Sequence, residues 1–223
     1  MKRSVVIVAG GSGTRMQSEI PKQFLEINGK PVIIWTIEKF LSFDPHIQVI
    51  VVLPGSHMLY WQDQIQRFPF LSQAISTAGG ISRFHSVRNG LAHVNPGNLV
   101  GIHDAVRPLV SLDTLERCYA EAEKTGCAIP VIDMEDSLRR ITKKGSSIFN
   151  RNLVKRVQTP QTFSSEKILT AYENCLDTTH TDDASVYESY FGKVHLVEGN
   201  KENLKITYPS DIRIAEILLT EKS

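Results

Sequence analysis

Apolar runs recur along the chain, and each is followed by a polar or glycine-rich segment. The four clearest runs cover 5–8, 47–53, 99–103 and 128–132. An uninterrupted run of β-branched and other apolar residues indicates a strand that is buried on both faces of its sheet. Residues with helical spacing separate these runs, for example over 32–41 and 112–124. Strands that alternate with helices predict an α/β protein with a mostly parallel sheet and helices on both faces.

The second half of the chain departs from this alternation. Residues 137–156 contain seven Lys or Arg residues and neither Asp nor Glu, with a turn predicted over 144–147 (KGSS). This composition predicts a protruding hairpin, or arm, whose charges either are simply solvated or serve an interaction. A strand over 194–198 and a helix over 210–219 follow, and Pro209 precedes the helix as a start signal.

The composition limits the class of protein. Of the 223 residues 41% are hydrophobic, which is enough to build a core without disulfides or metals. We find no repeat, linker or low-complexity tract, so the sequence predicts one domain over 1–223 with an arm at about 134–157. The formal net charge is +1, from 25 basic and 24 acidic residues. Bulk binding of nucleic acid is therefore not expected, and any electrostatic recognition has to be local.

Cysteine usage and the chain start indicate a location. Three cysteines without paired spacing fit a reducing environment rather than a disulfide framework or a zinc site. The apolar run at 5–8 is too short for a signal peptide, and no stretch reaches 18 apolar residues. The sequence therefore predicts a cytoplasmic protein that does not associate with membranes.

A glycine-rich loop follows the first predicted strand. It covers 9–16 (AGGSGTRM), and Pro21-Lys22-Gln23 comes shortly after. Gly10, Gly11 and Gly13 allow backbone N–H groups to approach a phosphate chain, unless they serve only a tight turn. The spacing matches neither the GxGxxG dinucleotide motif nor a P-loop. Two cations, Arg15 and Lys22, could still reach one polyphosphate, as phosphoryl or nucleotidyl transfer requires.

A second cluster, 103–108 (HDAVRP), lies at the end of the third predicted strand. Asp104 could bind ribose hydroxyls or a magnesium ion, and Arg107 could bind a phosphate. The alternative is an Asp–Arg pair that only stabilises the loop. We interpret His103 as structural, because nothing nearby in the sequence completes a triad or a metal site.

Further polar motifs occur in the C-terminal half. They are Arg151, 158–163 (QTPQTF), 181–185 (TDDAS) and 203–207 (NLKIT). Each motif alone could be a helix cap, a turn or a surface charge.

Together, the motifs AGGSGTRM, PKQ, HDAVRP, QTPQTF, TDDAS and NLKIT resemble the family of 2-C-methyl-D-erythritol 4-phosphate cytidylyltransferases. The resemblance implies a Rossmann-like, mostly parallel sheet of the nucleotide-diphospho-sugar transferase type. It also implies transfer of CMP from CTP to a polyol phosphate, with release of pyrophosphate, in non-mevalonate isoprenoid precursor synthesis. In this family a phosphate oxygen of the acceptor attacks the α-phosphorus, so no protein nucleophile is needed.

The resemblance also assigns roles to residues. Arg15 and Lys22 match the groups that stabilise the transition state, and Arg151 and Lys205 match those that orient the acceptor phosphate. The remaining matches contact substrate: Ala9, Gly10, Gly80 and Ser86 on the cytosine side, Gly11 and Gly13 in the glycine loop, Asp104, Ala105 and Arg107 for ribose and polyol, and Ser137, Thr181 and Thr207 on the acceptor and phosphate side.

Magnesium and a second subunit complete these implications. A Mg²⁺ ion would bridge triphosphate oxygens, and Asp104 is the one candidate protein ligand. In the family the arm crosses a two-fold axis, so Ser137 and Arg151 would complete the active site of the partner in a homodimer.

The chain departs from the family pattern at three points. Ile81 replaces an acidic or small polar residue near the base, Met134 and Glu135 look like an insertion, and Ser137 replaces the commoner threonine. Two alternatives stay open. D-ribitol 5-phosphate cytidylyltransferases share several motifs, although 150–153 (NRNL) and TDDAS favour the methylerythritol enzymes. A non-catalytic nucleotide-sensing module would not need both sets of phosphate-binding cations.

Overall fold

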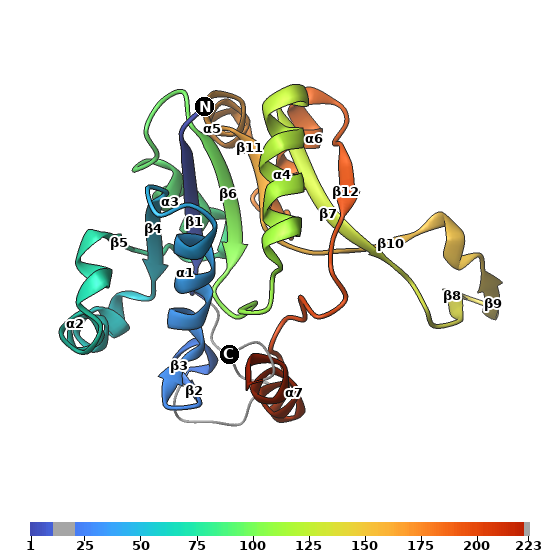
Figure 1. The fold of residues 1–223 in the computed structure, drawn as a ribbon. Coiled ribbons are helices and arrows are strands. Elements are labelled where there is room, and N and C mark those ends of the chain that lie inside the picture. The colour runs from blue at the N-terminus through green and yellow to red at the C-terminus, as the bar shows by residue number, and fades with distance from the viewer. Residues whose placement is uncertain (11–20, 221–223) are drawn as a thin grey trace.

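A central sheet of eight strands organises the chain (Figure 1). The computed structural model describes residues 1–10 and 21–220. The parallel part of the sheet consists of β1 (Arg3–Val8), β4 (Gln48–Leu53), β5 (Ile75–Ala78) and β6 (Leu99–Asp104). β1 lies between β4 and β6, and β5 pairs with the outer side of β4. These strands confirm the predicted alternation of strand and helix.

The other side of the sheet mixes strand directions. Its strands are β7 (Cys127–Asp133), β10 (Lys155–Val157), β11 (Gln161–Ser164) and β12 (Leu196–Glu198). β11 runs antiparallel between β6 and β7, β10 pairs antiparallel with the far end of β7, and β12 runs parallel to β7. The segment 158–163 therefore enters the sheet directly beside the end of β6.

Helices cover both faces of the sheet. On one face lie α1 (Val32–Phe43), α2 (Met58–Arg67) and α4 (Leu112–Thr125), and on the other lie α3 (Arg83–Leu91), α5 (Ser165–Asn174) and α6 (Asp183–Phe191). Alternate residues of β1 serve the two faces: Val5 and Ile7 pack with the α1 and α4 cluster, and Val6 packs with α3. This is why the run at 5–8 is apolar without interruption.

One glycine allows α3 to approach the sheet closely. A Cβ atom at Gly90 would lie 2.5 Å from Val6 Cγ1 and 2.7 Å from Val52 Cγ2, closer than side-chain atoms can pack. The helix thus rests directly on β1 and β4, and its first turn lies near the ends of these strands.

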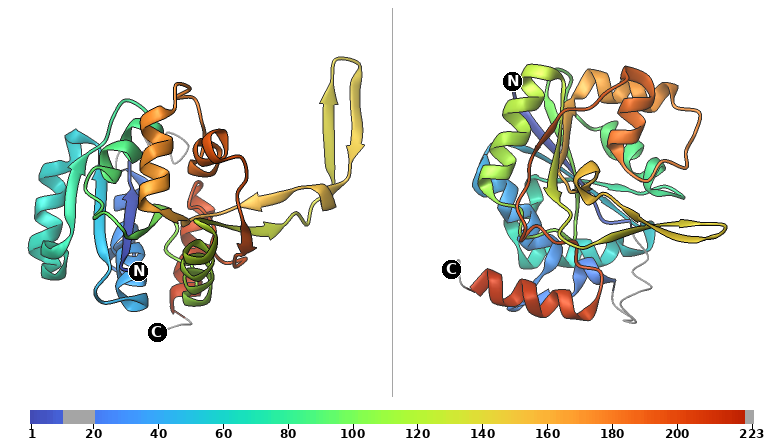
Figure 2. Two further views of the ribbon diagram at one scale, coloured as in Figure 1. Left: turned by 90° about the horizontal axis from the view of Figure 1, so that it is seen from above. Right: turned by 90° about the vertical axis from the view of Figure 1, so that its right-hand side faces the viewer.

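The basic segment forms the protruding arm that the sequence predicts (Figure 2). The arm is a hairpin of β8 (Leu138–Thr142) and β9 (Gly145–Phe149), followed by the short helix η5 (Arg151–Leu153). The ends of β7 and β10 carry it away from the body. The turn occupies 143–144 rather than the predicted 144–147. Gly145 has a φ of +126°, which suits glycine, and it already pairs with Thr142 as the first residue of β9.

The C-terminal helix and a small ribbon form a third cluster. α7 (Pro209–Thr220) packs near β2 (Glu26–Ile27) and β3 (Lys30–Pro31), together with Val106 and Ile206. Three short helices complete the described fold, namely η2 (Lys22–Phe24), η3 (Gly55–His57) and η4 (Pro69–Gln73). None of the helices within 1–10 and 21–220 is long and apolar enough to cross a membrane.

Candidate active site

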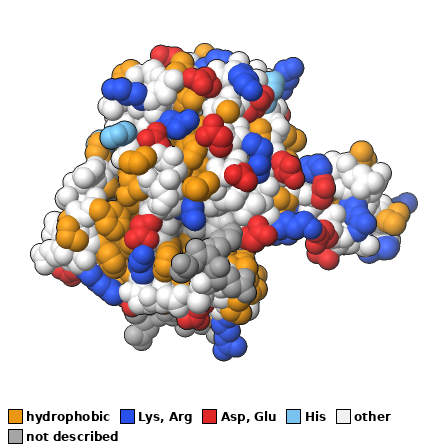
Figure 3. Space-filling model, viewed as in Figure 1, with side chains coloured by type: hydrophobic (Ala, Val, Ile, Leu, Met, Phe, Trp, Pro, Cys, Tyr) orange, Lys and Arg blue, Asp and Glu red, His pale blue; other side chains and the backbone are white. Residues whose placement is uncertain are grey.

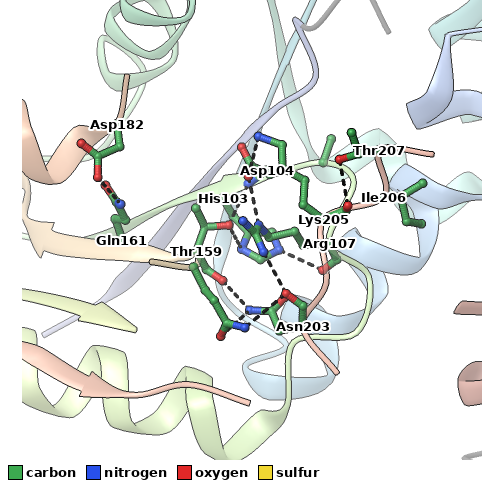
Figure 4. A network of polar contacts seen from close by, with 12 residues as sticks. His103, Asp104, Arg107, Thr159, Gln161, Asp182, Asn203, Lys205, Ile206 and Thr207 are labelled. Atoms are coloured by element: carbon green, nitrogen blue, oxygen red, sulfur yellow. Dashed lines mark hydrogen bonds and ion pairs between the residues drawn. The ribbon is translucent and has the colours of Figure 1, made fainter. Parts of the chain in front are cut away.

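Two cations share one carboxylate at the carboxyl end of β6 (Figure 4). Asp104 is the last residue of the strand, and its Oδ2 atom lies 3.0 Å from Arg107 Nε and 3.1 Å from Lys205 Nζ. The Asp104 side chain is nearly buried, whereas Lys205 remains 42% exposed. The structure therefore brings together three predicted site residues and leaves the ammonium group of Lys205 partly open to a ligand.

The charges of this triad favour an anionic ligand. Burial alone would raise the pKa of the Asp104 carboxyl, but Lys205, Arg107 and Arg83 outweigh burial and hold the pKa well below its usual range. Asp104 is therefore ionised at neutral pH. Because two cations face one carboxylate, the triad has a net charge of +1. Its carboxylate can accept hydrogen bonds from hydroxyl groups of a ligand, and its cations can donate hydrogen bonds to a phosphate.

His103 supports the triad from inside the protein. The ring is fully buried, with Nε2 3.1 Å from the Arg107 carbonyl oxygen and Nδ1 3.0 Å from Thr159 Oγ1. The Asp104 amide donates to the same Thr159 oxygen at 3.1 Å. Both ring nitrogens are thus engaged within the chain, as expected for a histidine that does not itself contact a ligand.

The segment 203–207 connects this triad to Lys22. Arg107 Nη1 donates to the Asn203 carbonyl oxygen at 2.8 Å, and Asn203 Nδ2 donates to the Thr159 carbonyl oxygen at 2.8 Å. Lys22 Nζ donates to the carbonyl oxygen of Ile206 at 3.1 Å. Lys22 therefore contacts the backbone of the residue that follows Lys205, although 184 positions separate Lys22 from Ile206 in the sequence.

Buried contacts hold the turn that carries Lys22. Gln23 is 1% exposed, and its Nε2 donates to the Ala9 carbonyl oxygen at 2.8 Å. Phe24 packs its ring against Tyr60, with the ring centroids 4.5 Å apart. The PKQ motif thus ties Lys22 to the end of β1, where the glycine loop begins.

The predicted cytosine-side residues also meet. Ser86 in α3 accepts a hydrogen bond from the Gly80 amide at 3.1 Å and donates to the Ser82 carbonyl oxygen at 2.9 Å. A Cβ atom at Gly10 would lie 3.2 Å from Ser86 Oγ. Ser86 therefore lies next to both Gly10 and Gly80 at the carboxyl edge of the sheet. Ligands of such folds bind at this edge.

A cleft of about 370 Å³ lies against the triad. Its walls are Arg83, Asp104, Arg107, Val157, Gln158, Thr159, Gln161, Thr181, Asp182 and Lys205. Thr181 is exposed there, and Asp182 begins α6 by accepting from the Ser185 amide at 3.1 Å. Gln161 Nε2 donates to Asp182 at 3.0 Å, so β11 positions this wall.

Arg83 is a cleft residue that the sequence reasoning missed. Its guanidinium donates two hydrogen bonds, 2.8 and 2.7 Å long, to the fully buried carboxylate of Asp183. Asp183 also accepts from Tyr172 Oη at 2.7 Å. Ser82, the N-cap of α3, signals the helix start in the sequence, but nothing in the sequence pairs Arg83 with a carboxylate 100 positions away.

Arg151 and Ser137 lie apart from this cleft within the chain. Both are exposed on or beside the arm, and Arg151 Nη1 donates to the Glu135 carbonyl oxygen. Arg151 lines a different cleft, of about 900 Å³, between the base of the arm and β12. Lys and Arg side chains are spread over the arm surface (Figure 3).

The remaining predicted residues vary in accessibility. Gly11, Gly13 and Arg15 lie outside the described residues. Ala9 and Ala105 are buried, and the Ala105 carbonyl oxygen accepts from Thr36 Oγ1 at 2.9 Å. Thr207 donates from its hydroxyl to the Lys205 carbonyl oxygen at 2.9 Å. Ile81 is 95% exposed beside Gly80, so it offers an apolar group where a polar one was expected.

A metal ion would find few protein ligands in this part of the chain. Within 1–10 and 21–220 no three His, Cys, Asp or Glu side chains gather into a metal site. Asp104 could contribute an oxygen, but its Oδ2 already faces two cations. A Mg²⁺ ion held beside Asp104 would therefore need further oxygen ligands from a bound substrate.

Known protein sequences match the chain over nearly its whole length. A family model described as 2-C-methyl-D-erythritol 4-phosphate cytidylyltransferase matches residues 4–221. An enzyme of that name from Phocaeicola vulgatus is 48% identical over 219 residues, which cover 98% of this chain and 100% of the relative. Another from Porphyromonas gingivalis is 46% identical over 221 residues, which cover 98% of each chain.

Solved structures match the fold to a similar extent. The 2-C-methyl-D-erythritol 4-phosphate cytidylyltransferase of Thermus thermophilus superposes with a TM-score of 0.81 at 30% identity, covering 99% of this chain and 100% of that one. A 4-diphosphocytidyl-2C-methyl-D-erythritol synthase from Anaerococcus prevotii superposes with a TM-score of 0.82 at 26% identity. The match covers 98% of this chain and 96% of that one.

Proposed function

Since the chain belongs to the family of 2-C-methyl-D-erythritol 4-phosphate cytidylyltransferases, we propose that the cleft beside Asp104 receives the phosphorylated acceptor. The enzyme transfers CMP from CTP to 2-C-methyl-D-erythritol 4-phosphate, with release of pyrophosphate, in isoprenoid precursor synthesis. Family membership confirms the methylerythritol interpretation over the ribitol alternative, and an enzyme over a sensing module. The observation that carries the site is one carboxylate shared by Arg107 and Lys205 at the end of β6.

The chain's own residues would act by positioning and by charge. A phosphate oxygen of the acceptor attacks the α-phosphorus of CTP, and the bond from that phosphorus to the bridging oxygen breaks as pyrophosphate leaves. Lys205 and Arg107 hold the acceptor phosphate or the developing charge, and Asp104 accepts hydrogen bonds from polyol or ribose hydroxyls. No side chain needs to become covalently attached.

The nucleotide would occupy the neighbouring part of the same edge. Gly10, Gly80 and Ser86 bind the cytosine, and Lys22 together with Arg15 contacts the triphosphate. The hydrogen bond from Lys22 to the carbonyl oxygen of Ile206 supports this arrangement, since it links Lys22 to the segment that carries Lys205. Asp104 is the candidate protein ligand for a Mg²⁺ ion, which when bound would neutralise charge on the triphosphate.

Arg151 and Ser137 would act in a second subunit. Within one chain, Arg151 and Asp104 line different clefts. Exchange of arms in a homodimer would allow Arg151 to reach the acceptor bound in the cleft of the other subunit. We further propose that residues 1–223 form one catalytic domain that works in the cytoplasm. CTP and the polyol phosphate are its partners, without nucleic acid or membrane.

Pyrophosphate release tests the function directly. The purified protein with CTP and Mg²⁺ is offered 2-C-methyl-D-erythritol 4-phosphate and D-ribitol 5-phosphate in parallel, with ATP, GTP and UTP as nucleotide controls. We expect rapid release only with CTP and methylerythritol phosphate. A preference for ribitol phosphate would contradict the assigned acceptor, and no release with either acceptor would contradict the proposed transfer.

Replacement of Lys205 tests the acceptor site. Lys205→Ala should lower kcat/KM for the acceptor about 100-fold, because one charged donor at a reacting phosphate is worth roughly 3 kcal/mol. Lys30→Ala is the matched control, since Lys30 also pairs with a carboxylate, that of Glu38, at 2.6 Å but lies away from the cleft. Equal kinetics of the two variants would argue against a role for Lys205.

A further inference from the structure

The His103 ring joins three separate segments of the site (Figure 4). It belongs to β6, contacts the turn after that strand through Arg107, and contacts the segment before β11 through Thr159. Its edge packs on Phe40 of α1, with the ring centroids 4.9 Å apart at 71°. The ring is fully buried, so these partners define its surroundings.

The partners also determine where the proton of the ring lies. The Arg107 carbonyl oxygen can only accept, so Nε2 carries the hydrogen. A neutral imidazole has a single N–H group, hence Nδ1 accepts and the Thr159 hydroxyl donates to it. Thr159 Oγ1 then accepts from the Asp104 amide. The hydrogen bonds thus run in one direction, from Asp104 through Thr159 to the ring and from the ring to Arg107.

These hydrogen bonds match an uncharged ring, and the full burial of the ring disfavours a charged one. Burial lowers the pKa of His103 and outweighs the hydrogen bond to the Arg107 carbonyl oxygen and the charge of Asp104, which both favour the protonated form. A protonated ring would carry a hydrogen on Nδ1 as well, and the Thr159 hydroxyl would have to turn away from it.

The ring restrains both ends of one short turn. Asp104 and Arg107 enclose this turn, which closes through a hydrogen bond from the Arg107 amide to the Asp104 carbonyl oxygen at 3.1 Å. We propose that His103, as the neutral Nε2–H tautomer, is a positioning residue that aims the Asp104 carboxylate and the Arg107 guanidinium at the acceptor. This inference rests on the proposed function of the cleft.

Two substitutions separate positioning from packing. His103→Phe keeps a ring against Phe40 but loses both hydrogen bonds, whereas His103→Gln keeps a donor near the place of Nε2. We expect His103→Phe to raise the acceptor KM about tenfold with the KM for CTP within about twofold, and His103→Gln to recover part of the loss. Tyr119→Phe is the control, since it removes another buried hydrogen bond, 2.7 Å long, to the Ser4 carbonyl oxygen. It should lower stability without changing either KM.

The outcomes are distinct. A loss in kcat alone with both KM values unchanged, as partial unfolding would produce, would overturn the proposal. If His103→Phe does not fold, the same comparison is made with His103→Gln, which should still raise the acceptor KM.

¹⁵N NMR of the wild-type ring at pH 7 should show a protonated Nε2 and a bare Nδ1, and the opposite tautomer or a cation would refute the assignment. Failure of the proposed function would appear separately, as a wild-type protein that does not use methylerythritol phosphate.

Discussion

Two neighbouring buried residues of this site, His103 and Asp104, differ in charge state. Asp104 and His103 are both buried, yet the first is charged and the second neutral. The difference follows from their neighbours: two cations face the carboxylate, whereas a carbonyl oxygen and a hydroxyl face the ring. Burial therefore disfavours the charged form in both cases, and only the carboxylate has partners that outweigh it.

The neutral state of His103 makes stability depend on pH. The unfolded chain binds a proton to this histidine below a pKa of about 6.5, while the folded chain does so only below about 4. Stability is therefore lost as the pH falls from 6.5 towards 4, by about 2 kcal/mol between pH 7 and pH 5. Urea unfolding of the wild type and of His103→Gln at pH 7 and pH 5 measures this loss in the free energy of unfolding. The variant should lose about 2 kcal/mol less than the wild type over that interval. Equal losses in both proteins would contradict the lowered pKa.

At the scale of elements, the close packing of α3 on the sheet positions Ser86 and Arg83 near the carboxyl ends of β1 and β4. Ser86, Gly80 and the Arg83–Asp183 pair all depend on where the first turns of α3 lie. The helix approaches β1 and β4 at Gly90, where even a methyl group has no space. The geometry of the cleft is thus linked to a contact in the core.

Gly90→Ala tests this contact. The added methyl group would push against Val6 and Val52, and we expect a net destabilisation of about 1–2 kcal/mol even after the gain in helix propensity. Urea unfolding measures the effect, with Gly55→Ala as the control because a Cβ atom there meets nothing within 4 Å. A Gly90→Ala protein as stable as the control would show that α3 can shift without cost.

The arm matters at the scale of the whole molecule. It holds Arg151 and Ser137 away from the cleft of its own chain, and its apolar side chains Ile141 and Ile148 are 80% and 83% exposed. Apolar groups on a protruding hairpin are suited to contact with a second copy of the chain. A two-fold arrangement would cover them and complete two sites at once.

Mixing of inactive subunits tests arm exchange. Lys22→Ala and Arg151→Ala proteins should each be nearly inactive. A mixed dimer would restore one intact site, so a fully exchanged mixture should reach about a quarter of wild-type activity. Lys22→Ala mixed with Lys205→Ala is the control and should not recover, since both residues belong to one body. Absence of recovery in the first mixture, with subunit exchange verified by native mass spectrometry, would show that each site comes from one chain.

Local sequence determined the elements and the family. Apolar runs predicted β1, β4, β6 and β7 to within two residues at each end, because the parts of a strand that are buried on both faces are apolar. The basic run predicted the arm, and six motifs identified the family. The same motifs supplied Asp104, Arg107 and Lys205 as candidates, since the charged groups of short motifs are visible in the sequence.

Tertiary structure alone decided which of these groups meet. Lys22 contacts Ile206, Arg83 pairs with Asp183, and His103 contacts Thr159, each across 56 or more positions. No local pattern encodes such pairs, because they depend on the order of strands in the sheet and on how closely helices pack on it. The antiparallel entry of β11 beside β6 brings Thr159 to His103. Sequence thus determined which chemical groups this protein carries, and packing at the carboxyl edge of the sheet decided how they are combined.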